Sequence, residues 1–280
     1  MVKKLEQHRA GLASTLFWKE IPEASLGAGM LRVEVKAVGM NFKDVLISVG
    51  VVAGPSAIGR GLGCECSGVI TDIGPGVSKH RVGDRVMVCS SGSFTTSMDV
   101  SEHLCVVTPD TLTFEQAASM PVVYSTVIYG LLDVARLAEG MSVLIHSAAG
   151  GVGIAAIQIA QMVGAEISCT VGTQTNVEFL TTSFGIPHDR IFNSRDAGFL
   201  HGIKQATGGR GVDVVLNALS GELLHASWKC VAECGAFVEI GRRDFVGQGM
   251  LAMEGFLSNR TFVGFDLAHL ADKRPLVTGE

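Results

Sequence analysis

A glycine-rich turn between a predicted strand and a predicted helix is the part of this 280-residue chain best suited to chemistry. Residues 143–163 read VLIHSAAGGVGIAAIQIAQMV and contain an A-x-G-x-x-G pattern. Glycines at such a turn let the backbone approach a pyrophosphate, and N–H groups at the helix N-terminus then bind its charge. The pattern predicts a dinucleotide site with five phosphate-binding positions: Ala148, Gly150, Gly151, Val152 and Gly153.

The same glycines could instead serve only to pack a helix closely against a strand. The dinucleotide interpretation is favoured because the pattern follows a strand, opens a helix and begins a run of alternating elements. Helix 151–163 is expected to be buried on a sheet along one face, formed by Val152, Ala156, Ile159 and Val163.

The end of the next predicted strand indicates which dinucleotide binds. In NAD-specific sites a carboxylate there accepts a hydrogen bond from the ribose 2′-hydroxyl, roughly 20 residues after the glycines. This strand is followed instead by Gly172 and Thr173, so no negative charge repels a 2′-phosphate. Arg195, after the third strand, offers a cation for that phosphate. These residues predict NADPH; the alternative for Arg195 is an exposed ion pair with Asp189 or Asp196.

Strands and helices alternate from residue 143 onward. Strands are predicted at 143–146, 166–171, 190–193, 212–219, 236–240 and 261–265, and helices at 151–163, 176–184, 199–207 and 223–232. Short connections between alternating elements specify right-handed crossovers and a parallel sheet with helices on both faces. The predicted fold class is therefore α/β, with a doubly wound parallel sheet.

The residues before this region predict a second, β-rich unit. Strands are expected at 31–39, 66–74, 84–90 and 103–109, with a helical stretch at 41–50 and a loop at 51–63. Thr113 and Gln116 form a capping box, which predicts that a helix begins there and that another follows at 125–137. A compact β domain is thus expected to precede the α/β domain.

Composition narrows the classes of function. The net charge of −5 argues against a nucleic-acid surface, which needs clustered Lys and Arg. The chain is 47% hydrophobic, but charged residues and glycines interrupt each apolar run before it reaches membrane-spanning length. The N-terminus lacks a secretory pattern. Seven cysteines without a C-x-x-C pair favour reduced thiols in the cytoplasm.

Three motifs in a fixed order resemble a known family: MNFKDVL at 40–46, HSAAGGVG at 146–153 and VEIGRRDF at 238–245. They resemble the medium-chain dehydrogenase/reductase superfamily, and most closely the enoyl reductase domain of fungal highly reducing polyketide synthases. The resemblance implies three parts, which are a GroES-like substrate domain at 1–121, a Rossmann NADPH-binding domain at 122–265, and the start of a C-terminal return to the substrate domain at 266–280.

This sequence departs from the pattern of the family at its C-terminus. The family normally continues for several tens of residues past the last Rossmann strand, whereas this sequence stops at Glu280. The expectation is either an excerpt of a larger synthase or an incomplete substrate domain.

The resemblance also implies a reductase without a metal. In zinc-dependent relatives the three catalytic zinc ligands correspond to Asn41, Cys64 and Val122 of this chain. One candidate ligand of three does not hold a catalytic zinc. Cys64 is interpreted as a small buried hydrophobic residue.

The activity implied by the resemblance is NADPH-dependent reduction of the α,β double bond of an enoyl thioester. Hydride transfer to the β-carbon leaves an enolate, which is protonated at the α-carbon. The implied partners are an acyl carrier protein bearing a phosphopantetheine-linked enoyl chain, the other domains of a synthase, and a second copy of the chain in a homodimer. The resemblance adds five cofactor-binding positions: Thr126, Asn217, Ala218, Leu219 and Gly241.

Three residues are candidates for the catalytic step, namely Asn41, Lys43 and Asp244. In the related animal fatty acid synthase domain a lysine and an aspartate are the proposed proton donors; Leu223 stands at the lysine position here, and the aspartate is kept as Asp244. Asp244 could orient a water or a substrate group, or could cap a turn. Lys43 could reach the cleft or could be a solvated surface lysine.

Two rival functions stay open. A stand-alone NADPH quinone or enone reductase would share the fold and cofactor, although NFKD resembles synthase domains more than the N-P-x-D of quinone reductases. A non-catalytic scaffold domain would be consistent with Leu223 and with Asn176, which stands where relatives often carry a lysine for the 2′-phosphate. The intact glycine turn favours cofactor binding over a scaffold role.

Overall fold

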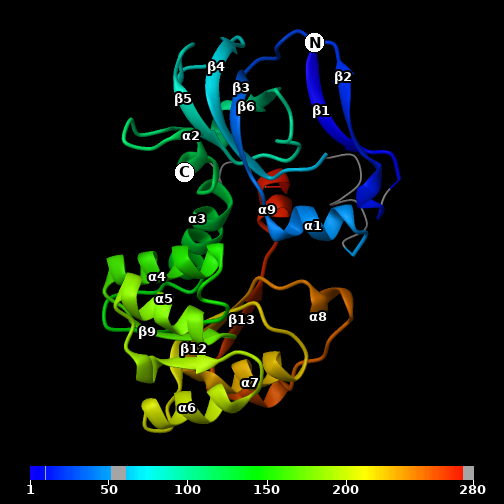
Figure 1. The fold of residues 1–280 in the computed structure, drawn as a ribbon. Coiled ribbons are helices and arrows are strands. Elements are labelled where there is room, and N and C mark those ends of the chain that lie inside the picture. Colours follow the sequence, from blue (N-terminus) through cyan, green and yellow to red (C-terminus); the bar gives the residue numbers. More distant parts are fainter. Residues whose placement is uncertain (10, 52–60, 274–280) are drawn as a thin grey trace. The chain divides into compact units, whose positions relative to one another are not determined.

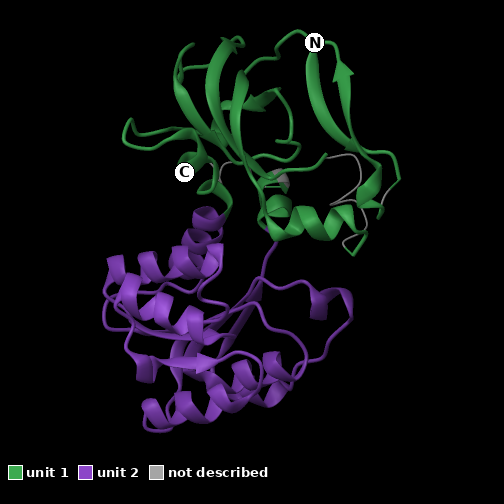
Figure 2. Ribbon diagram, viewed as in Figure 1, with its two compact units in different colours: residues 1–122, 267–280 green, residues 123–266 purple. Residues whose placement is uncertain are grey.

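The computed structural model describes residues 1–9, 11–51 and 61–273, which form two compact units (Figure 2). Unit 1 comprises Met1–Val122 and the segment from Leu267, and unit 2 comprises Val123–Asp266. Each border lies one residue later along the chain than predicted. Residues 52–60 of the predicted loop and 274–280 of the predicted return segment lie outside the described residues.

Unit 2 is built on a six-stranded parallel sheet (Figure 1). The strands in spatial order are β10 (Ile191–Asn193), β9 (Glu166–Val171), β8 (Ser142–Ile145), β11 (Val212–Asn217), β12 (Val231–Glu239) and β13 (Thr261–Gly264). The chain builds outward from β8 in one direction and then in the other. Ligands of such sheets bind at the carboxyl ends of the strands where this direction reverses, here between β8 and β11.

Helices cover both faces of this sheet. They are α4 (Gly151–Val163), α5 (Gln174–Phe184), α6 (Gly198–Ala206) and α7 (Glu222–Cys230). Apolar residues of α4 and α5 pack in one cluster with Val143 and Ile145, whereas those of α6 and α7 pack in a second cluster with Leu144. Because successive side chains of a strand point to opposite faces, the two clusters lie on opposite sides of the sheet. The predicted doubly wound α/β fold is confirmed.

The first of these helices buries the face predicted for it. Ala156 and Ile159 are buried, and Val152 and Val163 are half-buried. A left-handed Gly164, with φ of 77°, ends the helix.

Unit 2 differs from the prediction where tertiary contacts override local spacing. The helix predicted at 125–137 is α3 (Pro121–Val127) followed by a π-helical segment, η3 (Ile128–Val134). Apolar spacing does not separate these two helix types, and the π-helical turn brings Gly130 within packing distance of Val238. Strand β12 begins five residues before its predicted start. It is irregular between the two pairings of β11, where Cys234 adopts a left-handed φ of 60° and the register shifts.

Unit 1 contains a five-stranded antiparallel sheet and a two-stranded ribbon. The sheet order is β6 (Ser97–Ser101), β3 (Met30–Gly39), β4 (Glu65–Ile73), β5 (Arg85–Val88) and β7 (Cys105–Val107). Its core contains Leu31, Val33, Ile70 and Val86, all fully buried. The β-rich class predicted for this part of the chain is confirmed.

The sequence did not indicate the ribbon, formed by β1 (Val2–Gln7) and β2 (Leu16–Ile21), or the edge strand β6. Strand β2 is exposed along nearly its whole length, so it lacks the alternation of apolar and polar residues that marks a half-buried strand. The strand predicted at 103–109 begins instead with a 3-10 turn, η2 (Glu102–Leu104).

Unit 1 also contains short helices. They are α1 (Phe42–Ser48), α2 (Phe114–Ala118) and, in the C-terminal segment, α9 (Leu267–Lys273). The predicted capping box at α2 is present, because the Thr113 hydroxyl accepts from the Gln116 N–H at 3.2 Å and the Gln116 side chain accepts from the Thr113 N–H at 2.9 Å. Two further short helices in unit 2, α8 (Arg243–Val246) and η5 (Met253–Ser258), were not predicted.

All seven cysteines are free thiols. Burial raises the pKa of Cys66 and of Cys105 to about 12, which keeps both protonated. Over residues 1–9, 11–51 and 61–273, no helix combines the length and apolar character needed to cross a bilayer.

Candidate functional site

The glycine-rich turn links the carboxyl end of β8 to the first turn of α4. Ser147 adopts a left-handed φ of 53°, which bends the chain sharply after the strand. The Ala148 N–H donates to the Thr170 carbonyl of β9 at 3.1 Å, and the Gly150 N–H donates to the Ser147 carbonyl at 2.9 Å. Gly150 precedes α4 and makes no side-chain cap, so the first N–H groups of the helix are directed to the space beyond its N-terminus.

The glycines of this turn have different roles. A Cβ on Gly153 would lie 2.5 Å from the Cα of Ala148 and 2.6 Å from its carbonyl carbon and oxygen. Helix α4 therefore approaches the strand only because Gly153 has no side chain. A Cβ on Gly150 would meet only the Ser147 carbonyl, at 3.3 Å, and one on Gly151 only a single side chain, also at 3.3 Å. The backbone there can accept the close approach of a phosphate, so the turn fits a dinucleotide.

Gly172, Thr173 and Arg195 meet where β9 and β10 end. Arg195 Nε donates to the Gly172 carbonyl at 2.9 Å, and a Cβ on Gly172 would lie 3.1 Å from that nitrogen. The Thr173 hydroxyl accepts from the Asn176 N–H at 3.3 Å and so caps α5. An accepting hydroxyl can still donate its own hydrogen, which suits a phosphate oxygen.

The alternative ion pair of Arg195 is not formed. The Asp196 carboxylate accepts instead from the Asn193 side-chain amide at 3.0 Å and from the Gly198 N–H at 2.8 Å. Within residues 61–273 no ion pair joins Arg195 to Asp189 or Asp196. The side chain of Arg195 is exposed, and its Nε anchors it at the end of the sheet.

Asn217 and Gly241 lie at the carboxyl ends of β11 and β12 and are joined by Glu239. Asn217 Nδ2 donates to one carboxylate oxygen of Glu239 at 2.5 Å and to the Leu219 carbonyl at 2.7 Å. The Gly241 N–H donates to the other carboxylate oxygen at 2.5 Å. A Cβ on Gly241 would lie 3.6 Å from the Ala218 carbonyl. The four predicted cofactor residues of this region therefore gather at one end of two neighbouring strands.

Asp244 lies on α8, and both of its carboxylate oxygens accept from the Gly221 N–H, at 3.0 and 3.2 Å. Gly221 directly precedes α7, so this contact ties α8 to the beginning of α7. This contact gives Asp244 a structural role, which the sequence analysis left open as an alternative to a catalytic one. The catalytic role of Asp244 stays a prediction, as does the role of Thr126, which is buried on α3.

Asn41 and Lys43 belong to unit 1, at the beginning of α1. Asn41 Nδ2 donates to one carboxylate oxygen of the buried Glu65 at 2.8 Å, and the Val122 N–H donates to the other oxygen at 2.8 Å. Burial raises the pKa of Glu65, and these two hydrogen bonds oppose the rise. Glu65 therefore sets the orientation of the Asn41 amide. Lys43 is half-buried.

The donor set at the positions of the zinc ligands does not fit zinc. The Asn41 amide is engaged with Glu65, and the Val122 side chain has no donor atom. Burial, together with the charge of Asp44, raises the pKa of the Cys64 thiol to about 11, which disfavours the metal-binding thiolate. In the described part of the chain, no cluster of three or more His, Cys, Asp or Glu residues could hold a metal ion.

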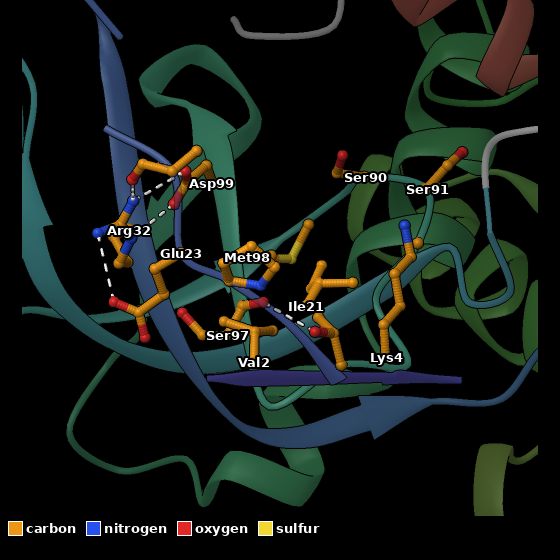
Figure 3. A pocket seen from close by; sticks show the side chains of 14 residues that line it. Val2, Lys4, Ile21, Glu23, Arg32, Ser90, Ser91, Ser97, Met98 and Asp99 are labelled. Atoms are coloured by element: carbon orange, nitrogen blue, oxygen red, sulfur yellow. Dashed lines mark hydrogen bonds and ion pairs between the residues drawn. The ribbon is translucent and has the colours of Figure 1, made fainter. Parts of the chain in front are cut away.

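A separate cavity of about 240 Å³ in unit 1 is lined by residues of β1, β2, β3 and β6 (Figure 3). Arg32 donates to both oxygens of Asp99, at 2.8 and 3.0 Å, and lies 3.7 Å from Glu23. The charges in this cavity therefore compensate one another. No residue predicted to bind cofactor or substrate lines it.

Sequence reasoning missed several buried polar residues of the described chain, and three of them adjoin or contact predicted site residues: Glu65, His146 and Glu239. The available signal was a single ionisable residue inside or directly after an apolar strand, because such a residue is rarely buried unless it is paired. Glu65 and Glu239 stand at such positions, beside the motifs GCE and VEIG.

Two family profiles match the chain. Residues 27–112 match the family described as "Alcohol dehydrogenase GroES-like domain", and residues 151–277 match the family described as "Zinc-binding dehydrogenase". Among solved structures, the CurK enoyl reductase is 36% identical with a TM-score of 0.89, and the match covers 99% of this chain and 85% of that one. The chain belongs to the enoyl reductases of the medium-chain dehydrogenase/reductase family. The resemblance of its three motifs is thereby confirmed.

Other relatives of this enoyl reductase extend the match. The JamJ enoyl reductase in its apo form is 31% identical, with a TM-score of 0.88 over 99% of this chain and 84% of that one. A quinone oxidoreductase of Escherichia coli, solved in complex with NADPH, is 27% identical, with a TM-score of 0.82 over 99% and 84%. The highly reducing polyketide synthase pspA of Penicillium soppii is 59% identical over 98% of this chain. The enoyl reductase chain spans only 11% of that synthase.

Proposed function

We propose that this enoyl reductase catalyses the NADPH-dependent reduction of an enoyl thioester carried on the phosphopantetheine of an acyl carrier protein. The observation that carries the proposal is the turn between β8 and α4, in a chain that belongs to the enoyl reductases. Gly153 lets α4 approach the strand, and Gly150 and Gly151 leave the backbone open to a pyrophosphate.

The residues of unit 2 bind and orient the cofactor. The N–H groups at the beginning of α4 bind the pyrophosphate, and Thr173 and Arg195 bind the 2′-phosphate. Asn217 and Gly241 line the crevice on the nicotinamide side. Bound NADPH supplies the hydride for the β-carbon of the substrate.

The residues of unit 1 serve the substrate. The developing enolate needs a hydrogen-bond donor, and the Asn41 amide has a second N–H beyond the one it donates to Glu65. Glu65 is buried and accepts hydrogen bonds from both Asn41 and Val122, so it fixes the orientation of the Asn41 amide. Binding of the thioester oxygen then costs little conformational entropy of this side chain. Lys43 of unit 1 and Asp244 of unit 2 are the proposed sources of the proton for the α-carbon.

The proposed partners follow from the length of the relatives. Since the chain matches about a tenth of a highly reducing polyketide synthase, we assign the acyl carrier protein and the other synthase domains as its partners. The cytoplasm is the proposed compartment, and the seven free cysteines support it.

The proposal predicts a preference for thioester substrates. We expect turnover of NADPH with a crotonyl thioester to exceed turnover with a simple quinone, measured as the loss of NADPH absorbance. The control is NADPH binding without substrate, followed by cofactor fluorescence. A preference for the quinone would reassign the chain as a stand-alone quinone reductase, and no binding at sub-millimolar NADPH would assign it a scaffold role.

Replacing Arg195 with alanine tests the choice of cofactor. We expect Arg195→Ala to weaken NADPH binding by about 1.5–3 kcal/mol, because a charged hydrogen bond to the 2′-phosphate is lost. NADH binding should be almost unchanged. Fluorescence titrations with both cofactors provide the measurement.

Arg190→Ala is a matched control, because Arg190 lies in the same unit and pairs with Glu166 at 3.7 Å, at the other end of β9. It should leave both affinities unaltered. Equal weakening of NADPH and NADH by Arg195→Ala would contradict the assigned role.

A further inference from the structure

A buried carboxylate lies beneath the nicotinamide side of the proposed cofactor crevice. Glu239 is the last residue of β12 and is 2% exposed. Each of its oxygens accepts one hydrogen bond, from the side chain of Asn217 and from the backbone of Gly241. Its two partners are both predicted cofactor positions, and they stand on adjacent strands.

This contact leaves little freedom to either partner. A Cβ on Gly241 would lie 2.7 Å from the nearer carboxylate oxygen, so the carboxylate fills the space that a side chain would need. Asn217 has used both hydrogens of its amide, one on Glu239 and one on the Leu219 carbonyl. Its Oδ1 is buried and has no hydrogen-bond partner among the residues that the structure describes. Only one orientation of this amide satisfies an ionised Glu239.

We propose that Glu239 is a positioning residue of the enoyl reductase: its ionised carboxylate holds the Asn217 amide and the Gly241 backbone in the geometry that binds the nicotinamide, and its protonation releases them. This inference rests on the proposed NADPH-dependent function. It assigns Glu239 no contact with cofactor or substrate, because it acts through Asn217 and Gly241.

Protonation reverses one contact of the carboxylate. A protonated oxygen donates its own hydrogen and accepts only weakly, so protonation weakens its bond to the N–H that Asn217 or Gly241 now directs at it. The unpartnered Oδ1 of Asn217 is the nearest buried acceptor of the same side chain, and turning the amide over would bring it to Glu239. The Leu219 carbonyl would then lose its donor, and the end of β11 would lose its present anchor.

Burial raises the pKa of Glu239 to about 7, against the hydrogen bonds from Asn217 and Gly241. Asp244 of α8 raises it further. The other charged side chains on elements packed against β12 are exposed or paired elsewhere. Those of η3 and α7 are exposed, namely Asp133, Glu222, His225 and Lys229. Asp213, at the far end of β11, pairs with Arg210, and Arg242 pairs with Asp266. The carboxyl group of Glu239 therefore changes its protonation state near neutral pH.

The test compares wild type with Glu239→Gln, whose amide imitates the protonated carboxyl group at all pH values. NADPH dissociation constants are measured by fluorescence between about pH 6 and 8.5. We expect the variant to bind about tenfold more weakly at pH 8.5, as for one lost hydrogen bond, and this gap to close towards pH 6. Titration of the 2′-phosphate in the same range affects both proteins equally and cancels in the ratio.

A control variant separates positioning from general loss of stability. Glu102→Gln alters another buried carboxylate, which accepts from the N–H groups of Ser78 and Lys79 in unit 1. It should leave the NADPH affinity of wild type unchanged at every pH. If Glu239→Gln does not fold, wild type alone provides the test, since its affinity for NADH, which has no 2′-phosphate, should fall as the pH drops through about 7.

The possible results distinguish the proposed role of Glu239 from the proposed NADPH-dependent function. A gap between wild type and Glu239→Gln that is absent or independent of pH, or a flat NADH profile of wild type, overturns the role of Glu239 and leaves the proposed function intact. No NADPH binding by wild type at any pH overturns both.

Discussion

Replacing Gly153 with alanine is expected to abolish NADPH binding and to destabilise unit 2 by about 3 kcal/mol, the upper end for overpacking a close contact. The added Cβ would lie 2.5–2.6 Å from three backbone atoms of Ala148. Backbone atoms cannot turn away as a flexible side chain does, so α4 must move off β8. The N–H groups at the beginning of α4 then no longer face the pyrophosphate. Thermal unfolding and NADPH fluorescence measure the two effects.

Gly150→Ala is the matched control for this result. Gly150 has an ordinary φ of −86°, and its Cβ would meet only the Ser147 carbonyl, at 3.3 Å. Gly150→Ala should unfold close to the wild-type temperature. It should nevertheless bind NADPH more weakly than wild type, because the methyl group occupies the space through which the phosphate approaches. The assignment of this turn would be refuted if Gly153→Ala bound NADPH as wild type does.

The free energy of unfolding of unit 2 is expected to carry a pH dependence that comes from one buried histidine. His146 follows β8 and is 3% exposed. Its Nδ1 lies 2.9 Å from the Thr170 hydroxyl, and its Nε2 lies 2.8 Å from the Ser227 hydroxyl. Because Ser227 donates to the Leu223 carbonyl at 2.6 Å, Nε2 carries the ring hydrogen and Nδ1 accepts from Thr170.

Burial lowers the pKa of His146 from 6.5 to about 3. Below pH 6.5 the unfolded chain binds a proton that the folded chain does not, so this contribution to stability is complete above pH 6.5 and is lost as the pH falls towards 3. At pH 5 the loss is about 2 kcal/mol. Glu239 acts in the opposite direction, because its pKa is raised from 4.5 to about 7 and folding is favoured as the pH falls between these values.

Comparison with His146→Gln isolates the histidine, because Glu239 is common to both proteins. The variant lacks a titrating ring, so its free energy of unfolding relative to wild type should gain about 2 kcal/mol between pH 7 and pH 5. Trp228 is buried in unit 2, and in a Trp18→Phe background its fluorescence follows urea unfolding of that unit alone. A difference that stays constant over this range would exclude His146 as the source.

Local spacing predicted much of unit 2 because its elements are regular and strongly apolar. Helix α4 and strand β9 begin and end at the predicted residues, since Gly150 and Gly164 mark the ends of a continuous helical pattern. The same reasoning missed β1, whose residues are mostly polar, and β2, whose residues are mostly exposed. Strand β1 also makes backbone contacts with residues 94–96, which are distant in the sequence and which its own pattern does not reveal.

The candidate site likewise has one part that the sequence predicts and one part that depends on tertiary contacts. The positions Gly150, Gly151 and Gly153 follow from a turn whose whole chemistry lies within a few residues. The anchor of Arg195 on Gly172 joins residues 23 positions apart, and the bond between Asn217 and Glu239 spans 22. Such contacts form only because β9 and β10, or β11 and β12, are neighbours in the sheet.

By itself, the sequence determined the doubly wound α/β fold and identified the turn and the cation that we propose to bind NADPH, because the period of apolar residues and the geometry of one turn are local properties. Only the tertiary structure decided that Glu65 orients Asn41, that Glu239 joins Asn217 to Gly241, and that His146 is buried between β9 and α7. These pairings depend on which strands lie side by side, and a buried polar group acquires its pKa and its orientation only from those neighbours.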